Sequence, residues 1–369
     1  MNPADCISLL RRAHHSYELN AIAAMTLEAI SSRGNLVRIL LLAFALIFPW
    51  RLLAQTPVRS LADGRDGTIF FASSTPTSLD QYLETTKVPE TVVSGELRLP
   101  AGTERVPAVV LSHSAGGVSE DRDLAWAERF TSIGIAVFIV DSFTLRGVKG
   151  FANQPSFATS VADVYAALRL LVTHPRIDPT RVALMGFSRG GTVALTAALE
   201  PVRRIGAPEG ERFAAQVALY PGCNTRFLAA NITEAPMLML LGGADDQAPP
   251  EPCRRYGEWF RGMGAAIKVV VYPGAHHLFD GTEPLHFIAQ ATTAGSCDTE
   301  YDIESRVLRR ADTGAVLTGN EIGTYFSACA SRGVHIGGDS DARAGAKRDI
   351  AAFFKATLLL PWVGDAAHP

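Results

Sequence analysis

One serine lies between glycines where two differently patterned segments meet. Gly186-Phe187-Ser188-Arg189-Gly190 follows a run of β-forming residues and precedes a run of good helix formers. A serine on such a sharp strand-to-helix turn has strained backbone angles and an exposed hydroxyl, and side chains two residues away would clash. The pattern predicts a nucleophilic hydroxyl beside a helix N-terminus, where a developing oxyanion is stabilised. A plain glycine-rich turn is the alternative.

A serine hydroxyl becomes nucleophilic when a base takes its proton and a carboxylate orients that base. After a turn of this kind, the three groups follow one another in the order Ser, Asp, His. Asp245 follows the apolar run MLMLLGG, and His277 follows the next apolar run. Both spacings leave room for strand-helix units, so we expect all three residues at the C-terminal edge of one parallel sheet. The neighbouring Asp246 and His276 are alternatives for the acid and the base.

A second glycine-rich segment lies upstream, where VVLSHSAGGVSE passes from an apolar run into a glycine pair. An oxyanion is stabilised by two N–H donors directed at the same oxygen, one following the nucleophile and one from another loop at the sheet edge. We expect the backbone N–H of Arg189 as the first donor and that of Ser114 or Ala115 as the second. The alternative for this segment is a flexible turn.

Apolar runs alternate with amphipathic segments over most of the chain. The expected strands are 91–99, 107–113, 135–141, 181–187, 213–220, 237–243 and 266–274, and the expected helices are 121–134, 160–174, 189–200, 252–264 and 342–359. Continuous apolar runs are typical of strands buried on both faces. Their alternation with helices predicts an α/β fold with a mostly parallel central sheet and helices on both faces. The polar residues 281–340 break this rhythm and indicate an insertion before the last helix.

Taken together, these segments resemble the dienelactone hydrolase family of α/β-hydrolases. The matching pieces are VVLSHSAGG, VDSFTLRG, HPRIDPTRVALMGFSRGG, LYPGC, LLGGADDQAPPEPC and VYPGAHHLFD, in the family's order over roughly 91–281. The resemblance implies the α/β-hydrolase fold, with Ser188 as nucleophile, Asp245 as acid and His277 as base. Offsets within the acid and base motifs select these residues over Asp246 and His276.

The activity that the resemblance implies is hydrolysis of small-molecule carboxylic esters or lactones through an acyl-enzyme, with no metal or organic cofactor. The name-giving members use cysteine where this chain has Ser188, so dienelactone itself is not the expected substrate. Two alternatives are a peptidase of the oligopeptidase type and a non-catalytic binding protein on a hydrolase fold. Peptidases of the oligopeptidase type carry a large propeller domain as well as the hydrolase domain. The intact order of Ser188, Asp245 and His277 argues against a non-catalytic binding protein.

An arginine follows the strand that ends at Asp141, in IVDSFTLRGVKG. The resemblance implies that Arg146 binds a carboxylate of the substrate, and a guanidinium offers a planar pair of donors that fits this group. The alternative is that Arg146 braces its loop by pairing with Asp141 or with a backbone carbonyl.

The first 54 residues are typical of an export signal. A lead with two arginines precedes the apolar run 39–48, and we expect cleavage after Ala54. The segment before Met25 looks like an extension that results from placing the start of the reading frame too early. The run is short for a membrane span, which needs about 20 residues. An uncleaved anchor is the alternative. Residues 55–369 would then form a single periplasmic or secreted hydrolase domain without stable membrane insertion.

The composition and the cysteines fit such a protein. The net charge of -3, without a long basic run, gives no reason to expect a nucleic-acid partner. Four cysteines follow the expected signal, and an even number in an exported protein suggests disulfides. We expect Cys223–Cys253, because each follows a strand at the same sheet edge, and Cys297–Cys329, both in the insertion. Buried free thiols are the alternative.

Overall fold

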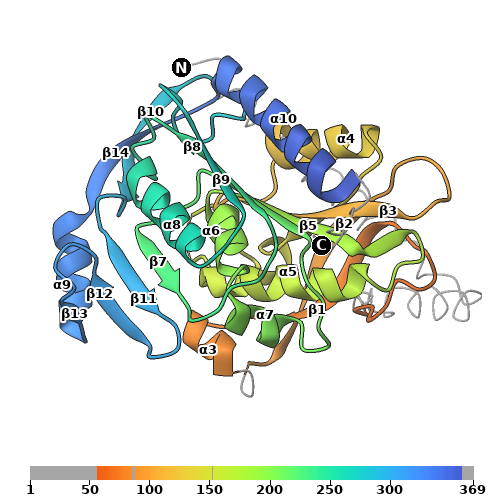
Figure 1. The fold of residues 1–369 in the computed structure, drawn as a ribbon, viewed down its shortest axis with the longest axis horizontal. Helices are drawn as coiled ribbons and strands as arrows, with labels where there is room; N and C mark the ends of the chain where they lie inside the picture. Colours follow the sequence, from red (N-terminus) through yellow and green to blue (C-terminus); the bar gives the residue numbers. More distant parts are fainter. Residues whose placement is uncertain (1–55, 85–87, 152, 360–369) are drawn as a thin grey trace, which may run out of the picture. The chain divides into compact units, whose positions relative to one another are not determined.

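The computed structural model describes residues 56–84, 88–151 and 153–359 (Figure 1). These described residues form one compact unit. The expected export signal, residues 1–54, lies outside the described residues. Within the described ranges, no helix has the length and the apolar character that a membrane crossing requires.

Eight strands form the central sheet, in the order β1-β2-β4-β3-β5-β6-β8-β9 (Figure 1). β1 is antiparallel to β2 and β2 to β4, and the remaining neighbours are parallel. The strands span β1 Gly67–Ser74, β2 Glu90–Arg98, β3 Val106–Ser112, β4 Ala136–Asp141, β5 Ile177–Phe187, β6 Ala215–Leu219, β8 Met237–Gly242 and β9 Ile267–Tyr272. The expectation of a mostly parallel sheet is confirmed.

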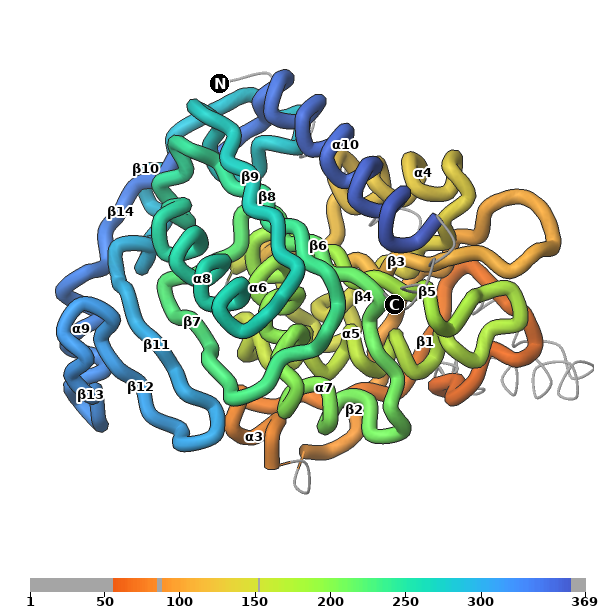
Figure 2. The backbone as a smooth tube through the Cα atoms, in the orientation of Figure 1, coloured from red at the N-terminus to blue at the C-terminus, as the bar shows by residue number. Residues whose placement is uncertain are grey.

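Helices cover both faces of the sheet (Figures 1 and 2). One face carries α4 (Ala125–Ser132) and α10 (Ser340–Phe354), and the other carries α5 (Phe157–Leu171), α6 (Arg189–Thr196), α7 (Glu200–Gly206) and α8 (Pro250–Gly262). A short helix, α3 (Leu79–Glu84), lies beside α5 and α7. Strand side chains alternate between the two cores: Val110 packs on the α5 side and Val109 on the α4 side.

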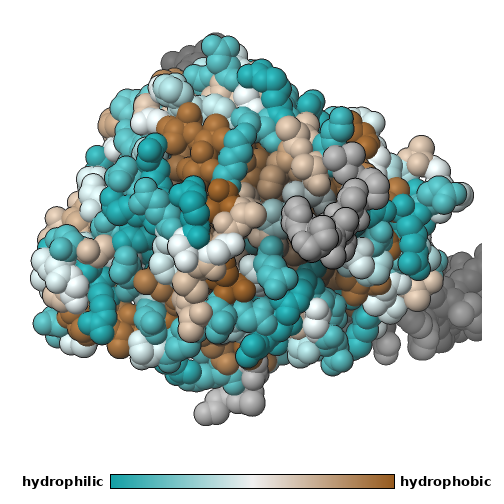
Figure 3. All heavy atoms as spheres, viewed as in Figure 1, coloured by the Kyte–Doolittle hydropathy of each residue, from teal (hydrophilic) through white to brown (hydrophobic). Residues whose placement is uncertain are grey.

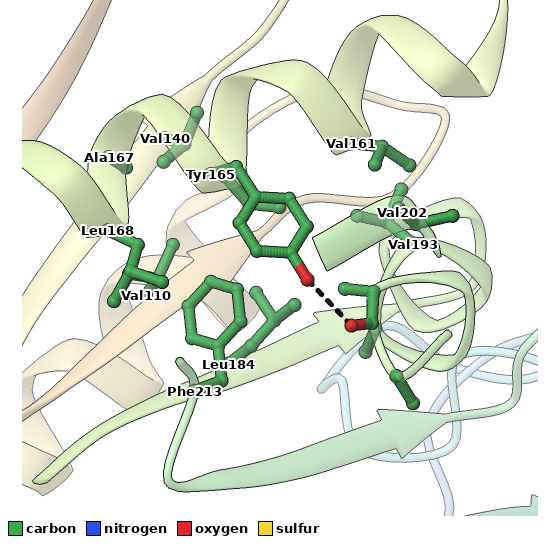
Figure 4. Packing of buried hydrophobic residues seen from close by; sticks show 14 of the residues in the cluster. Val110, Val140, Val161, Tyr165, Ala167, Leu168, Leu184, Val193, Val202 and Phe213 are labelled. Carbon is green, nitrogen blue, oxygen red and sulfur yellow. Dashed lines mark hydrogen bonds between the residues drawn. The ribbon is translucent and has the colours of Figure 1, made fainter. Parts of the chain in front are cut away.

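The core on the α5 side is dense around Tyr165. Figure 4 shows its ring among Leu168, Val193 and Phe213. The buried hydroxyl donates a hydrogen bond to the carbonyl of Ala197 (2.7 Å), so the polar tip of this large side chain is satisfied. α5 is buried along almost its whole length, which is typical of a helix with apolar residues on all sides.

The edge strand β9 is only partly covered. Figure 3 shows hydrophobic residues gathered between α8 and α10, where this strand runs, and most of its residues are half-buried. Lys268 on β9 pairs with Asp349 of α10 (Nζ to Oδ1, 2.8 Å). A charged residue on an edge strand discourages pairing with a strand of another chain.

The helix expected over 189–200 ends earlier and is followed by a separate helix, which corrects the sequence-based prediction. α6 ends at Thr196 and α7 begins at Glu200, with Pro201 in its first turn. Proline has no N–H group and cannot donate a hydrogen bond to the preceding turn, so Pro201 is favoured in the first turn of a new helix over the interior of a continuous one. The N–H of Glu200 instead donates to the carbonyl of Asn231 (3.0 Å), a contact distant in sequence.

The insertion forms two small sheets beside the central one. β10 (His286–Thr293) and β14 (Ser331–Ile336) pair as an antiparallel ribbon, which we call the β10–β14 ribbon. A second sheet has the order β13-β12-β11-β7, with strands Val316–Leu317, Val307–Arg310, Thr299–Asp302 and Thr225–Leu228, and α9 (Asn320–Cys329) follows β13. β7 was not expected from the sequence. Its parallel pairing with β11 ties the insertion to the hydrolase core.

Two disulfides are present, Cys223–Cys253 and Cys297–Cys329, and these are the pairs expected from the sequence. Cys297 follows β10, and Cys329 precedes β14. The second disulfide therefore joins the two strands of the β10–β14 ribbon just beyond their last paired residues, Thr293 and Ser331.

Removing this second disulfide should destabilise the protein. Cys297 and Cys329 are 32 residues apart in sequence, and closing such a loop contributes about 3–4 kcal/mol in the chain-entropy model. The double variant Cys297→Ser/Cys329→Ser should unfold at a lower urea concentration than the unmodified protein. Non-reducing peptide mapping checks the pairing itself. An unchanged urea midpoint, or free thiols in protein from the periplasm, would contradict this prediction.

Candidate active site

Ser188 stands at the junction of β5 and α6 with strained backbone angles. Its φ of 52° and ψ of -111° are unusual for a residue with a side chain. The flanking glycines are required by space. A Cβ atom at Gly186 would lie 1.9 Å from the carbonyl oxygen of Gly190, and one at Gly190 would lie 1.9 Å from that of Ser112. The turn therefore raises the Ser188 hydroxyl above the sheet edge.

Ser188, His277 and Asp245 form a continuous line of hydrogen bonds. The distance from His277 Nε2 to Ser188 Oγ is 2.8 Å, and that from His277 Nδ1 to Asp245 Oδ2 is 2.7 Å. The other carboxylate oxygen of Asp245 accepts from the backbone N–H of Gln247 (3.0 Å) and Ala248 (2.7 Å). Asp245 and His277 are each 3% exposed. The carboxylate is thus held in place, and it orients the imidazole with Nε2 towards Ser188.

The two alternative residues face the insertion. The carboxylate of Asp246 accepts from the backbone N–H of His335 (2.8 Å) and bonds its ring Nδ1 (2.8 Å). The ring centre of His276 lies 5.5 Å from that of His335. Partial burial alone would raise the pKa of Asp246, but the hydrogen bonds from His335 outweigh it and lower the pKa below its usual value. These contacts favour Asp245 and His277 as the acid and the base.

An aromatic side chain supports His277 from behind. The Tyr220 ring meets the imidazole edge-on at 4.8 Å between centres, and its hydroxyl donates to Asp280 Oδ1 (2.6 Å). Trp126 donates to the other oxygen of Asp280 (2.8 Å), and burial raises the pKa of that carboxyl. Tyr220 was not expected at the site from the sequence. The only local sign that Tyr220 lies near the site was its position at the end of an expected strand, in the motif LYPGC.

The backbone after β3 is held by His113. The carbonyl of Ser114 accepts from His113 Nδ1 (2.6 Å) and from the N–H of Gly117 (3.1 Å), while His113 Nε2 accepts from the N–H of Ser142 (3.2 Å). Burial lowers the pKa of His113. Because Nε2 accepts a hydrogen bond and Nδ1 faces a carbonyl oxygen, the ring is neutral with its proton on Nδ1. In a trans peptide, the N–H points away from the preceding carbonyl. The N–H of Ala115 therefore points away from His113.

Arg189 is the first residue of α6, where backbone N–H groups lack an acceptor within the helix. Its side chain turns away and donates to the carbonyls of Pro155 (2.8 Å) and Ser156 (2.7 Å). Burial lowers the pKa of this guanidinium to about 10. What Arg189 offers beside the serine hydroxyl is thus its backbone N–H.

A pocket of about 680 Å³ opens over these groups. Ser188, His277, Ser114 and Ala115 all line it. The insertion contributes Gly281, Glu283, Ile288, Gln290, Ala291, Thr292, Ile336, Gly337 and Gly338. None of these insertion residues was expected at the site from the sequence. A single sequence shows only that this segment is polar and irregular.

Arg122 also lines the pocket, although the sequence placed it only in a helix. Its side chain is 6% exposed, and its Nη2 donates to Ser114 Oγ (3.2 Å). Its Nε lies 3.9 Å from Asp123 Oδ2, and its guanidinium lies 5.7 Å from the ring centre of Phe187. A buried cation therefore contacts the loop after β3, and the only sequence signal for it was an arginine shortly after the glycine pair.

All three guanidinium nitrogens of Arg146 donate hydrogen bonds to oxygens of the protein. Nη1 and Nη2 form a two-bond pair with Asp163 of α5 (2.7 and 2.9 Å). They also donate to the carbonyls of Ser142 (2.7 Å) and Ser74 (2.8 Å), and Nε donates to Thr75 Oγ1 (2.9 Å). The guanidinium is buried and is not among the residues that line the pocket.

These contacts are those of a loop brace, and a substrate carboxylate would have to displace Asp163. The bonds of Arg146 to two backbone carbonyls match the brace expected from the sequence, whereas its ion-pair partner differs. Asp141 does not pair with Arg146, because its Oδ1 accepts from the backbone N–H groups of Phe143 and Thr144 (both 2.9 Å). The ion-pair partner of Arg146 is Asp163. The local sequence around Asp163 does not indicate this pairing.

Arg146→Met should therefore lower stability without changing substrate preference. It leaves the Asp163 carboxylate buried without its partner, a change that typically costs about 3–5 kcal/mol. The melting temperature should fall, and kcat/KM should decline by the same factor for an ester with a free carboxylate and for its neutral methyl analogue. A selective rise in KM for the acidic ester, with an unchanged melting temperature, would restore the substrate-binding role.

Comparison with known proteins places this site in a family. The dienelactone hydrolase family matches residues 93–296, more than half of the chain. A Methylorubrum extorquens protein with the provisional name carboxymethylenebutenolidase is 25% identical over 201 residues, covering 51% of this chain and 68% of that protein. An uncharacterised Mycobacterium tuberculosis protein is 30% identical over 207 residues, covering 51% of this chain and 70% of its own.

Among solved structures, a thermophilic esterase of Thermogutta terrifontis is similar, with 20% identity and a TM-score of 0.43 over 52% of this chain and 82% of that one. The resemblance inferred from the sequence motifs is confirmed by the family match over residues 93–296. The chain therefore belongs to the dienelactone hydrolase family, and it is a carboxylic ester hydrolase with the α/β-hydrolase fold.

Proposed function

We propose that this protein hydrolyses small-molecule carboxylic esters or lactones through an acyl-enzyme formed on Ser188. The observation that carries the proposal is the hydrogen-bonded line from Ser188 Oγ through His277 to Asp245, open to a pocket at the serine end. Such a line converts a weak hydroxyl into a nucleophile, because the base removes the proton as the bond to carbon forms.

In the first half of the reaction, Ser188 Oγ attacks the ester carbonyl and its proton passes to His277 Nε2. The carbonyl oxygen becomes an oxyanion, for which we propose the N–H groups of Arg189 and Ala115 as donors. The orientation of the Ser114–Ala115 peptide, held by His113, supports Ala115 over Ser114. The bond between the carbonyl carbon and the alcohol oxygen then breaks, and that oxygen takes the proton from Nε2.

In the second half, water attacks the acyl-enzyme and gives its proton to His277 Nε2. The oxyanion forms again, the bond between the acyl carbon and Ser188 Oγ breaks, and Oγ recovers the proton. Asp245 stabilises the imidazolium that forms in each half and keeps the ring in one tautomer. The backbone bonds to Asp245 keep this carboxylate in position throughout.

Two measurements separate this proposal from its alternatives. A fluorophosphonate probe should label Ser188, and peptide mapping should find the label on that residue; an unlabelled protein would favour a non-catalytic binder. The purified protein should hydrolyse p-nitrophenyl esters much faster than matched peptide anilides; the reverse ratio would favour a peptidase. Lactones belong in the substrate panel because of the name of the Methylorubrum relative.

We further propose that the protein works in the periplasm or outside the cell, as a single catalytic domain carrying the insertion. Structural disulfides persist in oxidising compartments, and the two disulfides are consistent with an extracellular protein. The proposed signal, residues 1–54, is tested by N-terminal sequencing of the exported protein, which should begin after Ala54.

A further inference from the structure

The β10–β14 ribbon has two chemically distinct faces. Ile288 pairs with Val334, and residues two apart on a strand share a face, so Ile336 lies on the face of Ile288. Phe287 pairs with His335 on the opposite face, where their rings lie 4.8 Å apart between centres. Ile288 and Ile336 line the pocket, whereas Phe287 is 55% exposed. One face of the ribbon therefore forms a wall of the pocket, in which the two isoleucines are apolar and the side chains of Gln290 and Thr292 are polar.

The ribbon is bound to the loops that carry both proposed partners of Ser188. On the base loop, the N–H of Gly337 donates to the carbonyl of His277 (2.9 Å). On the acid loop, His335 bonds to Asp246, and Thr293 Oγ1 donates to the carbonyl of Gln247 (2.6 Å). The wall is thus held at a defined distance from the reacting groups, and the disulfide Cys297–Cys329 closes its far end.

We propose that the β10–β14 ribbon selects the substrate, and that Ile288 and Ile336 bind an apolar chain of the ester. The inference rests on the proposed esterase function and names its substrate class, which is esters or lactones with a medium-length aliphatic chain. Leu278 and Ala291 add apolar surface to the same pocket. A pocket of about 680 Å³ is far larger than an acetyl group needs, and each methylene that it buries should raise kcat/KM about fourfold.

The test compares two positions that are adjacent on β10. Ile288→Trp fills the pocket beside the wall, and Ile288→Ala enlarges it. Ala289→Trp is the matched control, because Ala289 is exposed and is not among the residues that line the pocket. Each variant is assayed on p-nitrophenyl acetate, butyrate and octanoate, which vary the acyl chain, and on methyl, butyl and octyl acetate, which vary the alcohol.

We expect the unmodified protein to prefer the longer chain in one of the two series. In that series, Ile288→Trp should lower the ratio of kcat/KM for the octanoyl or octyl substrate to kcat/KM for the shortest substrate. The decrease should be at least about tenfold, since several methylenes lose their contacts. p-Nitrophenyl acetate should still be hydrolysed. Ile288→Ala should shift the preference towards longer chains, and Ala289→Trp should leave the ratio unchanged.

The inference is overturned if neither substitution of Ile288 changes the ratio in either series, or if Ala289→Trp changes it equally. If Ile288→Trp loses activity on every ester, the same ratio of kcat/KM measured for Ile288→Ala tests the proposal instead. Failure of the proposed function itself looks different: the unmodified protein would hydrolyse neither series and would resist the fluorophosphonate probe.

Discussion

Ser188→Ala should reduce kcat on a p-nitrophenyl ester by about 10⁴–10⁶-fold, because no other group supplies the nucleophile. His277→Ala should cause a loss of similar size. The Ser188 hydroxyl and the imidazole, 2.8 Å apart, act as one unit, so the double variant should be little worse than either single variant. Steady-state kinetics with the purified protein measures all three.

The controls for this prediction are structural. Both substitutions remove side-chain atoms at the pocket and leave the glycines of the turn in place, so each variant should keep the circular dichroism spectrum of the unmodified protein. Losses that multiplied in the double variant would show that Ser188 and His277 work independently. Full activity in Ser188→Ala would end the serine-hydrolase proposal.

Asp245→Asn should lower kcat by about 10⁴-fold, because the amide keeps the shape of the carboxylate but favours the wrong tautomer of the imidazole. The neighbouring substitution Asp246→Asn is the matched control. Its amide oxygen can still accept the bond from the backbone N–H of His335, which lies 2.8 Å from the carboxylate. We therefore expect kcat to change by no more than about a few-fold in Asp246→Asn.

This pair of variants separates the two adjacent carboxylates by one measurement. The acid role predicts a large fall in kcat for Asp245→Asn at every substrate chain length. Anchoring of the β10–β14 ribbon by Asp246 predicts, at most, a changed preference among chain lengths. A larger loss in Asp246→Asn would mean that the acid has been assigned to the wrong residue.

Much of the fold could be predicted because its signals are local. The apolar runs that became β3, β5 and β8 are buried on both faces, and this burial leaves a continuous apolar sequence. The turn at Ser188 is recognisable from its glycines, because the geometry of the turn leaves no room for a Cβ atom at those positions. Parallel strands end at one edge of a sheet, so the order of Ser188, Asp245 and His277 along the chain sufficed to bring them together.

The sequence alone also predicted both pairs of cysteines, because Cys223 and Cys253 each follow a strand at the same sheet edge, and Cys297 and Cys329 both lie in the insertion. It left other choices open wherever two candidates are adjacent in the chain. From the residues themselves, Asp245 and Asp246 were equivalent carboxylates after a glycine pair, and only the resemblance favoured one. The structure separates them by direction: one faces His277 and the other faces His335.

Only the tertiary structure decided the partners of Arg146 and the role of the insertion. Arg146 and Asp163 form a buried ion pair between a loop and a helix, and nothing in their spacing distinguishes that pair from Arg146 with Asp141. Likewise, Ile288 and Ile336 reach the pocket because the β10–β14 ribbon docks on the loops of Asp246 and His277. Local sequence patterns report which face of an element is buried, but they do not report which distant element covers it, because that depends on how the whole chain packs.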